Sequence, residues 1–570
     1  MRSMDIAEKD ANSARVRDGA GHPPLLGRKS VLMGMLTSGF VVANAAQASS
    51  ASAGTIMPVA IVASSPPYVC KWAPATAYPV GTQVISPGSD VVSANVAHTS
   101  AAAFATDVAK WTQSCTFSGA GVCVRAYGAV GNGVTLDQRA INAAITANPG
   151  RAIHLTKGAL GTTIYQIDGN YAGGQGIRLN QPGTQLVLDP GVTIRVNPNG
   201  LDRYAAITVT AADCSVTGGA IVGDVGSHTG TTGEWGHGLD IQHGAHRFKV
   251  QGTYISKCWG DGIIICDTVT SNTTGAKPSD VSIIDVVCDD NRRQGLSIIT
   301  ALRPRILGGS FINTGRTAAT APTAGIDIEP NPGGLQDVIG FSIIGAVMQG
   351  NAGRGLTVHA QGRTVSGTVQ GVRSIGNTWY GFSSESTAAV EFVGCTAVGN
   401  KEYGFILQSG TTGRNVFNGC TADGNLKLGF DVPTLGEAIG CHARNNGWAG
   451  FYLSGAGTAT ACTATGNNTA DSYYGQFAVE GGTAVRLVGC VSSVGTNTAK
   501  PNKGFDVKSG STGTRLISCA TVGTFTGGAF VDGGTGTSAF PVPGAAKPTG
   551  VAVTVAGVHA ALCTLGIISA

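Results

Sequence analysis

Residues 288–299 read Cys-Asp-Asp-Asn-Arg-Arg-Gln-Gly-Leu-Ser-Ile-Ile, and this stretch contains the pattern on which the fold depends. Its skeleton is Asn, three variable residues, Gly and an apolar residue, here extended to an apolar, variable, apolar triplet. The skeleton returns at Asn351-Gly355, Asn377-Gly381, Asn400-Gly404, Asn425-Gly429 and Asn446-Gly450. The Gly and the apolar residue occur without the Asn at Gly238, Gly262, Gly325 and Gly504. Successive glycines of the pattern from Gly238 to Gly450 stand 21 to 33 residues apart, a period typical of solenoids built from stacked coils.

Short runs in which apolar and polar residues alternate occur within the repeats, for example Leu239-Asp240-Ile241-Gln242 and Ile326-Asp327-Ile328-Glu329. Alternation with a period of two buries one face of a segment and exposes the other, as a β-strand requires. The 86 glycines among 570 residues supply the left-handed corners that a coil of several short strands needs. We therefore predict an all-β fold, a right-handed parallel β-helix solenoid.

Two residue types recur at the coil period in a way that predicts stacked ladders. The repeated Asn suits an inward corner, where its amide can bond backbone groups and the equivalent Asn of the next coil, about 4.8 Å away. A second ladder is predicted for Cys395, Cys420, Cys441, Cys462, Cys490 and Cys519, read as buried free thiols rather than disulfides. Three cysteines outside this ladder are better candidates for disulfide pairing, namely Cys70, Cys115 and Cys123.

Composition restricts the class of partner. Charged residues make up 12% of the chain, and 37 Lys and Arg against 33 Asp and Glu leave a net charge of +4. This excess is too small to indicate a nucleic acid or an anionic membrane as partner. Because the repeat covers most of the length, we predict one elongated domain with small additions. The predicted divisions are an export signal (1–48), a small β module (49–118), a parallel β-helix catalytic domain (119–535) and a C-terminal linker and cap (536–570).

The first 48 residues have the features of an export signal. Arg28-Lys29 precede the apolar run 31–43, and small residues for cleavage follow at Ala43-Asn44-Ala45. The apolar run is too short for a transmembrane helix, so we predict export without membrane insertion. The sequence leaves open whether the route is the general or the twin-arginine one, because Lys29 stands where the second arginine would be.

The module at 49–118 carries Trp72, Tyr78 and Trp111. Exposed aromatic rings could bind sugars, so one hypothesis is a carbohydrate-binding module; the alternative is that these rings form its core. Farther along, Thr135-Leu-Asp-Gln138 predicts a capping box for a helix through Ile141 and Ile145. Such an N-terminal helix would cover the open end of the coil stack, which otherwise exposes apolar core and unpaired strand edges.

The stretch from Val124 through Ile153-His154-Leu155-Thr156-Lys157-Gly158 resembles the opening of pectate-lyase-like right-handed β-helix proteins. This superfamily includes rhamnogalacturonases, pectate and other polysaccharide lyases, alginate epimerases and phage tailspikes. The resemblance covers roughly residues 120–535 and implies a β-helix that acts on polysaccharide. It leaves the reaction open, because the superfamily hosts hydrolysis, β-elimination and epimerisation. There is also a resemblance to a recurring bacterial subgroup of secreted β-helix proteins, carried by Gly260-Asp261-Gly262, residues 291–295 and residues 325–331. This second resemblance implies no particular substrate.

Alignment of the coils on the repeated Gly predicts which side chains share a face. Ionisable residues concentrate between 236 and 359, along a strip only a few coils long. The sharpest pair is Asp327 and Glu329, which point to the same side of one strand with Cα atoms roughly 7 Å apart. Arg293 lies one coil earlier and Arg354 one coil later, and Asp240 with Asp261 extends the acidic strip.

Two chemistries fit this strip. In the first, Asp327 and Glu329 hold a hard cation such as Ca²⁺, which neutralises a uronate carboxylate, and a base then removes the adjacent proton for β-elimination. Arg293, Arg292 and His237 are the candidates for that base, since the resemblance to calcium-dependent pectate lyases implies an arginine base. In the second, Asp327 and Glu329 act as acid and base in glycoside hydrolysis, without a metal.

The sequence therefore predicts an exported, polysaccharide-degrading enzyme, with a lyase of uronate-containing polysaccharide placed ahead of a glycoside hydrolase and an epimerase as a minor option. A non-catalytic, tailspike-like glycan-binding protein is the alternative from another class, and the oligomer could be a monomer or a homotrimer. The predicted catalytic residues are Asp327, Glu329, Arg293, Arg292, Asp261 and His237. The predicted substrate-binding residues are Asp240, Arg354, His359, Lys257, Trp259 and Arg316.

Overall fold

The computed structural model of the chain describes residues 70–87, 91–113, 121–157, 163–266, 277–332, 336–385, 387–408, 413–470, 473–496 and 503–539. The predicted export signal, and the predicted C-terminal linker and cap beyond residue 539, lie outside the described residues. Among the described residues, no helix combines the length and the apolar character needed to span a bilayer.

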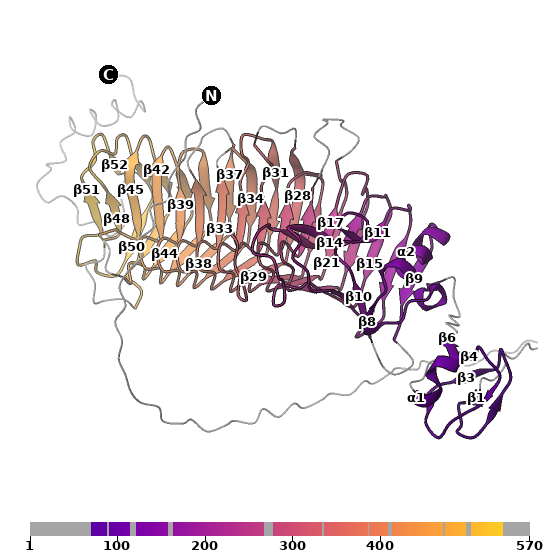
Figure 1. Cartoon of the computed structure of the whole chain (residues 1–570). Helices are drawn as coiled ribbons and strands as arrows, with labels where there is room; N and C mark the ends of the chain where they lie inside the picture. Colours follow the sequence, from indigo (N-terminus) through magenta and orange to yellow (C-terminus); the bar gives the residue numbers. More distant parts are fainter. Residues whose placement is uncertain are drawn as a thin grey trace, which may run out of the picture. The chain divides into compact units, whose positions relative to one another are not determined.

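From residue 122 onward the coils give short strands to three parallel sheets, so that strands of successive coils lie side by side (Figure 1). Most coils give one strand to each sheet, and the coil with β24 and β25 gives two to the third sheet. Sheet I contains, within the described residues, β8 (Asn132–Leu136), β10 (Ile164–Ile167), β13 (Thr193–Val196), β16 (Ala220–Val222), β19 (Tyr254–Ser256), β22 (Val287–Asp289), β26 (Ser310–Ile312), β29 (Val347–Gln349), β32 (Arg373–Ile375), β35 (Thr396–Val398), β38 (Thr421–Asp423), β41 (His442–Arg444), β44 (Thr463–Thr465), β47 (Val491–Ser493) and β50 (Ala520–Val522).

Sheet II follows one corner later in each coil. It contains, within the described residues, β11 (Gln175–Leu179), β14 (Arg203–Val209), β17 (Trp235–Ile241), β20 (Ile263–Ile265), β23 (Leu296–Ile298), β27 (Ile326–Ile328), β30 (Leu356–Val358), β33 (Phe382–Glu385), β36 (Phe405–Gln408), β39 (Phe430–Val432), β42 (Phe451–Gly455), β45 (Phe477–Gly482), β48 (Phe505–Val507) and β51 (Phe530–Asp532).

Sheet III completes the coil. It contains, within the described residues, β7 (Val122–Cys123), β9 (Ala152–Leu155), β12 (Gln185–Leu188), β15 (Ser215–Thr217), β18 (Lys249–Gln251), β21 (Ser282–Ile284), β24 (Ala301–Leu302), β25 (Arg305–Leu307), β28 (Val338–Ile344), β31 (Val365–Gln370), β34 (Ala389–Val393), β37 (Asn415–Asn418), β40 (Gly436–Ile439), β43 (Thr458–Thr460), β46 (Arg486–Val488), β49 (Arg515–Ile517) and β52 (Ser538–Ala539). The predicted right-handed parallel β-helix is confirmed.

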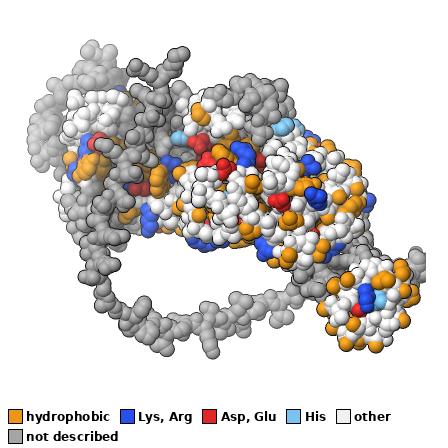
Figure 2. Space-filling view, in the orientation of Figure 1, with side chains coloured by type: hydrophobic (Ala, Val, Ile, Leu, Met, Phe, Trp, Pro, Cys, Tyr) orange, Lys and Arg blue, Asp and Glu red, His pale blue; other side chains and the backbone are white. Residues whose placement is uncertain are grey.

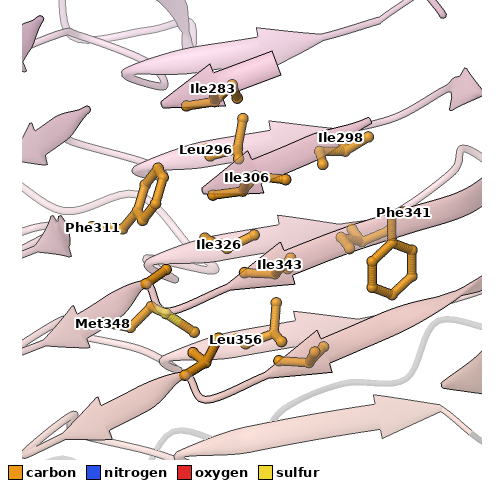
Figure 3. Close-up of a cluster of buried hydrophobic side chains, with 14 of the residues drawn as sticks. Ile283, Leu296, Ile298, Ile306, Phe311, Ile326, Phe341, Ile343, Met348 and Leu356 are labelled. Atoms are coloured by element: carbon orange, nitrogen blue, oxygen red, sulfur yellow. The ribbon is translucent and has the colours of Figure 1, made fainter. Parts of the chain in front are cut away.

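The core lies inside the coils and is built by the alternation seen in the sequence. In β27, Ile326 and Ile328 are completely buried and lie in register with Leu356 and Val358 of β30. Figure 3 shows Ile326 and Leu356 among the buried side chains. In the later coils aromatic rings replace these aliphatic side chains and stack face to face, with centroids 4.7–5.1 Å apart. This ladder consists of Phe382, Phe405, Phe430, Phe451, Phe477 and Phe505. Charged side chains are sparse on the face that Figure 2 shows, as the composition predicts.

Both predicted ladders are present. From Asn377 to Asn467 the Asn Oδ1 of each coil accepts hydrogen bonds from the backbone N–H and the Nδ2 of the Asn one coil earlier, as between Asn425 and Asn400 at 3.1 and 2.9 Å. Asn291 lies outside this ladder, since its Oδ1 accepts from the N–H of Cys258 and its Nδ2 has no partner among the described residues. Asn467 continues the ladder beyond the predicted members, and the carboxamide of Gln476 ends it. The six ladder cysteines are buried free thiols, whereas Cys123 is disulfide-bonded, in agreement with its separate assignment.

Helix α2 (Gln138–Ala147) is the predicted N-terminal helix, and it buries Ile141 and Ile145 in the same core. The predicted capping box is wrong. Thr135 belongs to strand β8, and Asp137 occupies the N-cap position without a side-chain hydrogen bond to the helix. The Asp137 carboxylate instead accepts hydrogen bonds from the N–H groups of Val130 and Gly131, at 2.7 and 2.9 Å. These bonds fix the preceding loop, so tertiary contacts override the local capping signal.

The small N-terminal module has its own core. It comprises β1 (Cys70–Lys71), β2 (Ala77–Tyr78), β3 (Gln83–Ile85), β4 (Val91–Ala94), β5 (His98–Thr99), α1 (Phe104–Asp107), a 3₁₀ turn (Val108–Lys110) and β6 (Trp111–Gln113). Tyr78 and Trp111 are buried in this core with their rings edge to face at 4.9 Å, and Trp72 packs against Phe104 at 5.5 Å. These three rings therefore belong to the core of the module or pack against it. Carbohydrate binding by the module stays a prediction, and these rings do not supply an exposed aromatic surface for it.

The Asn ladder predicts a large penalty for breaking one rung. Asn425→Ala removes the acceptor of Asn400 and leaves the carbonyl oxygen of Ala397 without its amide donor. Since these groups are buried, we expect a loss of about 2–3 kcal/mol in the free energy of unfolding, measured by urea denaturation. The matched control is Asn418→Ala, because Asn418 is exposed. A change of about 0.5 kcal/mol is the limit expected there. Equal effects of the two substitutions would contradict the ladder's role.

Candidate active site

The outer face of sheet II carries the row of side chains that the sequence alignment predicted. The register of β17, β20, β23, β27 and β30 brings together five residues in successive coils, and these are Asp240, Ile264, Ser297, Asp327 and Thr357. Each lies between two inward-facing residues of its strand, as Asp327 does between Ile326 and Ile328. The row therefore faces away from the core.

A hollow of about 470 Å³ lies on this face and is lined by charged side chains from several coils. Its lining includes Arg203, Glu234, His237, Asp240 and Arg293. Of these, His237, Asp240 and Arg293 are predicted site residues. Arg203 and Glu234 were not predicted, because they lie outside the Gly-based repeat and have no equivalents in other coils.

Arg293 connects two acids from different coils. Its Nη1 lies 3.4 Å from Oδ2 of Asp261, and its Nε lies 3.4 Å from Oε2 of Glu234. Burial raises the pKa of Asp261 to about 6, although the Arg293 charge opposes that rise. The guanidinium therefore lies where a buried carboxylate needs a counter-charge.

His237 accepts a hydrogen bond at Nδ1 from the backbone N–H of Asp261, at 3.2 Å. Burial, together with the positive charges of Arg293 and Arg203, lowers the pKa of His237 to about 3. The ring is therefore neutral at physiological pH. A histidine in this state orients the Gly260–Gly262 turn but is a very weak base.

Asp327 lies on the outer face, yet it is 2% exposed rather than open to the surface as the sequence suggested. Gln294, from the preceding coil, reaches across it and donates a hydrogen bond from Nε2 to Oδ2 at 2.6 Å. The orientation of this amide is fixed, since Gln294 Oε1 accepts from the N–H of Ala324 at 2.8 Å. Burial and the neighbouring Glu329 charge raise the pKa of Asp327 to about 8. Its Oδ1 atom has no hydrogen-bond partner among the described residues.

The pKa of Glu329 is shifted in the opposite direction, below its usual value. Its Oε1 atom accepts a hydrogen bond from Nε2 of Gln361 at 3.0 Å and lies 3.5 Å from Nδ1 of His359. The bond from His359 lowers the pKa of Glu329, and it outweighs the effect of partial burial. The pair therefore holds one neutral and one ionised carboxyl group near neutral pH, the arrangement that divides acid and base roles between two carboxyls.

The structure uses several other predicted residues differently. Trp259 is sandwiched between the Arg292 guanidinium and the ring of His228, each 3.8 Å away, so it supports a loop instead of offering a free ring. Lys257 and Arg316 both bind Asp290 and do not line the hollow. Their distance from the strip reflects the corner that they occupy, which the Gly-based alignment does not distinguish.

Asp240 and Arg354 lie at the two ends of the predicted strip. Asp240 accepts a hydrogen bond from Gln242 at 2.7 Å, and burial raises the pKa of Asp240. The guanidinium of Arg354 lies over the rings of Trp379 and Tyr380, at 5.0 and 5.5 Å. The structure thus brings Arg354 to an aromatic surface rather than to Asp327.

The predicted calcium site at Asp327 and Glu329 fits these surroundings poorly. The described residues contain no group of three or more His, Cys, Asp or Glu side chains arranged for a metal ion. The oxygens of the pair face amide donors, and the nearby Arg293 already supplies positive charge. No catalytic step is therefore derived through a metal.

The role of Arg293 as a counter-charge can be tested by titration. In Arg293→Met we expect the pKa of Asp261 to rise above about 6, because burial remains and the opposing guanidinium is lost. The pKa of Asp261 would be measured from the carboxyl stretch in infrared difference spectra, with Asp261→Asn used to assign the Asp261 band. Arg247→Met, which removes an exposed partner of Asp213, is the control and should leave this titration unchanged. An unaltered pKa of Asp261 in Arg293→Met would refute the role.

Comparison with known proteins adds likenesses of fold. No family model matches the chain. The SPbeta prophage-derived uncharacterized protein YorA of Bacillus subtilis is 33% identical over 111 residues, which cover 18% of this chain and 18% of that protein. The A-module of the mannuronan C-5 epimerase AlgE6 of Azotobacter vinelandii has a TM-score of 0.38 at 14% identity, covering 74% of this chain and 99% of the module.

Tailspike protein 3 of bacteriophage CBA120 has a TM-score of 0.42 at 12% identity, covering 84% of this chain and 79% of the tailspike. These likenesses concern architecture alone. The chain's own three long parallel sheets identify the fold as a right-handed parallel β-helix.

Proposed function

We propose that the protein is an exported enzyme that cleaves uronate-containing polysaccharide by acid–base hydrolysis at Asp327 and Glu329. One observation carries this proposal: two carboxyl groups lie on the outer side of one coil in different surroundings, Asp327 being 2% exposed and Glu329 less buried and beside His359. Their opposite pKa shifts support the same division. The predicted export signal agrees with a substrate outside the cell.

In this mechanism Asp327 donates its proton to the glycosidic oxygen, and the bond to the anomeric carbon breaks. Glu329 accepts a proton from the water that attacks that carbon. The cycle leaves Asp327 ionised and Glu329 protonated, and exchange with solvent restores both. Inverting glycosidases keep their carboxyls about 6.5–9.5 Å apart to admit this water, and retaining ones keep them about 5–5.5 Å apart. The anomeric configuration of the product would therefore report which of the two geometries this pair adopts.

The arginines of the hollow support an acidic sugar. Arg203 lines the hollow, lies over the Trp235 ring at 4.8 Å and forms no ion pair among the described residues. An arginine in that position can bind a carboxylate through two parallel hydrogen bonds. A uronate unit would supply the missing counter-charge.

β-Elimination is the second candidate, because the same arginines would neutralise the uronate carboxylate. Its base is the weak point. Burial lowers the pKa of Arg293, but Asp261 and the other nearby carboxylates outweigh this and raise it above the usual value. His237, whose pKa is about 3, is no better suited. The absence of a suitable base among these two residues supports our choice of hydrolysis over elimination, the reverse of the order that the sequence suggested.

Substitution of the two carboxyls tests the enzyme hypothesis. We expect Asp327→Asn and Glu329→Gln each to lower kcat on a uronate polysaccharide at least about 100-fold, the usual size of an acid–base contribution. The substrates are polygalacturonate, alginate and hyaluronate, and reducing ends and near-ultraviolet absorbance are followed together. Hydrolysis creates reducing ends without the absorbance of an unsaturated uronate.

The matched control is Asp431→Asn, since Asp431 lies in the same outward row and burial likewise raises its pKa, to about 7. It should retain wild-type kcat. An increase in near-ultraviolet absorbance would show that the reaction is β-elimination and would contradict the proposed hydrolysis. Full activity of Asp327→Asn would remove the pair from the mechanism, and a wild type that degrades none of the three polymers would favour a binding protein.

The pH profile provides an independent test. Activity requires Glu329 to be ionised, which holds above its lowered pKa, and Asp327 to be protonated, which holds below about pH 8. We therefore expect a plateau through the neutral range with kcat/KM falling above about pH 8. The descending limb should shift when Arg293 is replaced, because its charge lowers the pKa of Asp327. A profile that stays flat up to pH 10 would contradict the assignment of the acid.

A further inference from the structure

A row of aromatic side chains lies on the surface of the later coils, away from the hollow's lining. We call it the aromatic strip, and it consists of Trp379, Tyr380, Tyr403, Trp448 and Tyr474. Neighbouring rings along the strip have centroids 5.3–6.3 Å apart, so the row is continuous over several coils. None of the five is part of the phenylalanine ladder inside the coils.

The aromatic strip lies on the same corner of the coil as Arg293. Backbone hydrogen bonds connect Trp379 to Gly353 of the coil before it, Glu402 to Trp379, Lys427 to Glu402 and Trp448 to Lys427. Each of these residues stands two positions before the coil's central glycine, and Arg293 holds that position before Gly295. The corner that carries the candidate site therefore continues, coil by coil, into the strip.

Packing accounts for only part of the strip, because Tyr403, Trp448 and Tyr474 pack against a small cluster of Leu428, Ala449 and Ala478 while Trp379 and Tyr380 lie outside that cluster. Trp379 is 44% exposed, and the other four rings are half-buried. The indole N–H groups of Trp379 and Trp448 and the hydroxyls of Tyr380 and Tyr403 form no hydrogen bond with any described residue. Both indole rings are tilted to the adjacent tyrosine, by 58° and 54°, so that neither is stacked on it, although a cation lies over one face of each indole. A contiguous exposed patch with unused polar groups marks a binding surface.

The cations beside the strip indicate the kind of ligand. Lys427 lies over Tyr403 and Trp448, at 5.8 and 5.3 Å, and forms an ion pair with Glu402. Arg354 lies over Trp379 and Tyr380 but has no ion pair among the described residues. Its Nε atom is buried without a hydrogen-bond partner there. Arg354 can therefore bind a carboxylate at the end of the strip nearer to Asp327.

We propose that the aromatic strip binds an extended stretch of polyuronate chain beyond the cleaved bond, with Arg354 holding one uronate carboxylate. The rings offer apolar faces to the sugars, and the free N–H and hydroxyl groups bond their hydroxyls. Coils repeat every 4.8 Å or so, close to the length of one sugar unit, so successive units would meet equivalent positions. The direction towards the site rests on the proposed function; binding by the strip does not.

Affinity electrophoresis tests the strip directly. The full-length protein is run in native gels containing polygalacturonate, alginate or hyaluronate, with dextran as the neutral polymer. We expect at least one polyuronate to retard the wild type, and Trp379→Ala with Trp448→Ala in one chain to weaken this binding at least fivefold. Arg354→Gln should weaken binding of the polyuronate and reduce its salt dependence. The control is Tyr254→Ala, because Tyr254 is an exposed aromatic residue on sheet I.

Kinetics separate this inference from the proposed function. The double variant should raise KM for a long polymer without changing kcat, and leave short oligosaccharides unaffected. Asp327→Asn should lose turnover and keep the gel retardation, so failure of the catalytic assignment leaves the strip standing. Retardation that is equal in the wild type and the double variant would overturn the proposal. So would a fall in oligomer mass of the double variant by sedimentation, because the strip would then be a subunit interface.

Discussion

The depth of one coil, about 4.8 Å, is the constraint on which this structure depends. Every corner residue must fit between its equivalents above and below. At Gly404 a Cβ atom would lie 2.7 Å from the carbonyl oxygen of Gly429 and 2.9 Å from the amide of Asn425, so only glycine fits. The same Asn amide bonds the next coil. The Asn and the Gly of the repeat are thus two parts of one joint, which fixes both spacing and register.

Fixed register is what gives the candidate site its chemistry. Arg293, Gln294 and Asp327 come from two coils, yet their positions follow from strand pairing between β23 and β27. Because the scaffold holds them, a carboxyl group can remain buried beside a charged neighbour, and its protonation is set by its surroundings. Loops between the strands, such as the one bearing Glu234, then add charges that change the electrostatic potential around this rigid row. Catalysis would need little rearrangement of the backbone.

The sequence predicted the coil architecture, both ladders and the strip that holds Asp240 and Asp327, because all of these follow from one repeated spacing. The sequence did not predict the burial of Asp327. Gln294 covers this carboxyl group because of the length and orientation of its side chain, and the repeat period carries no information on either. Arg203 and Glu234 have no equivalents in other coils and therefore gave no signal. Lys257 and Arg316 were misplaced for a related reason: linear proximity to the repeat does not reveal which corner a residue occupies.

The cysteine ladder provides a set of built-in probes of local unfolding. Cys395, Cys420, Cys441, Cys462, Cys490 and Cys519 are fully buried, and each belongs to a different coil. A thiol-specific reagent can reach a given sulfur only after its coil has separated from a neighbour. The order in which the six become alkylated therefore reports which end of the solenoid unzips first, and whether its coils part singly or in blocks.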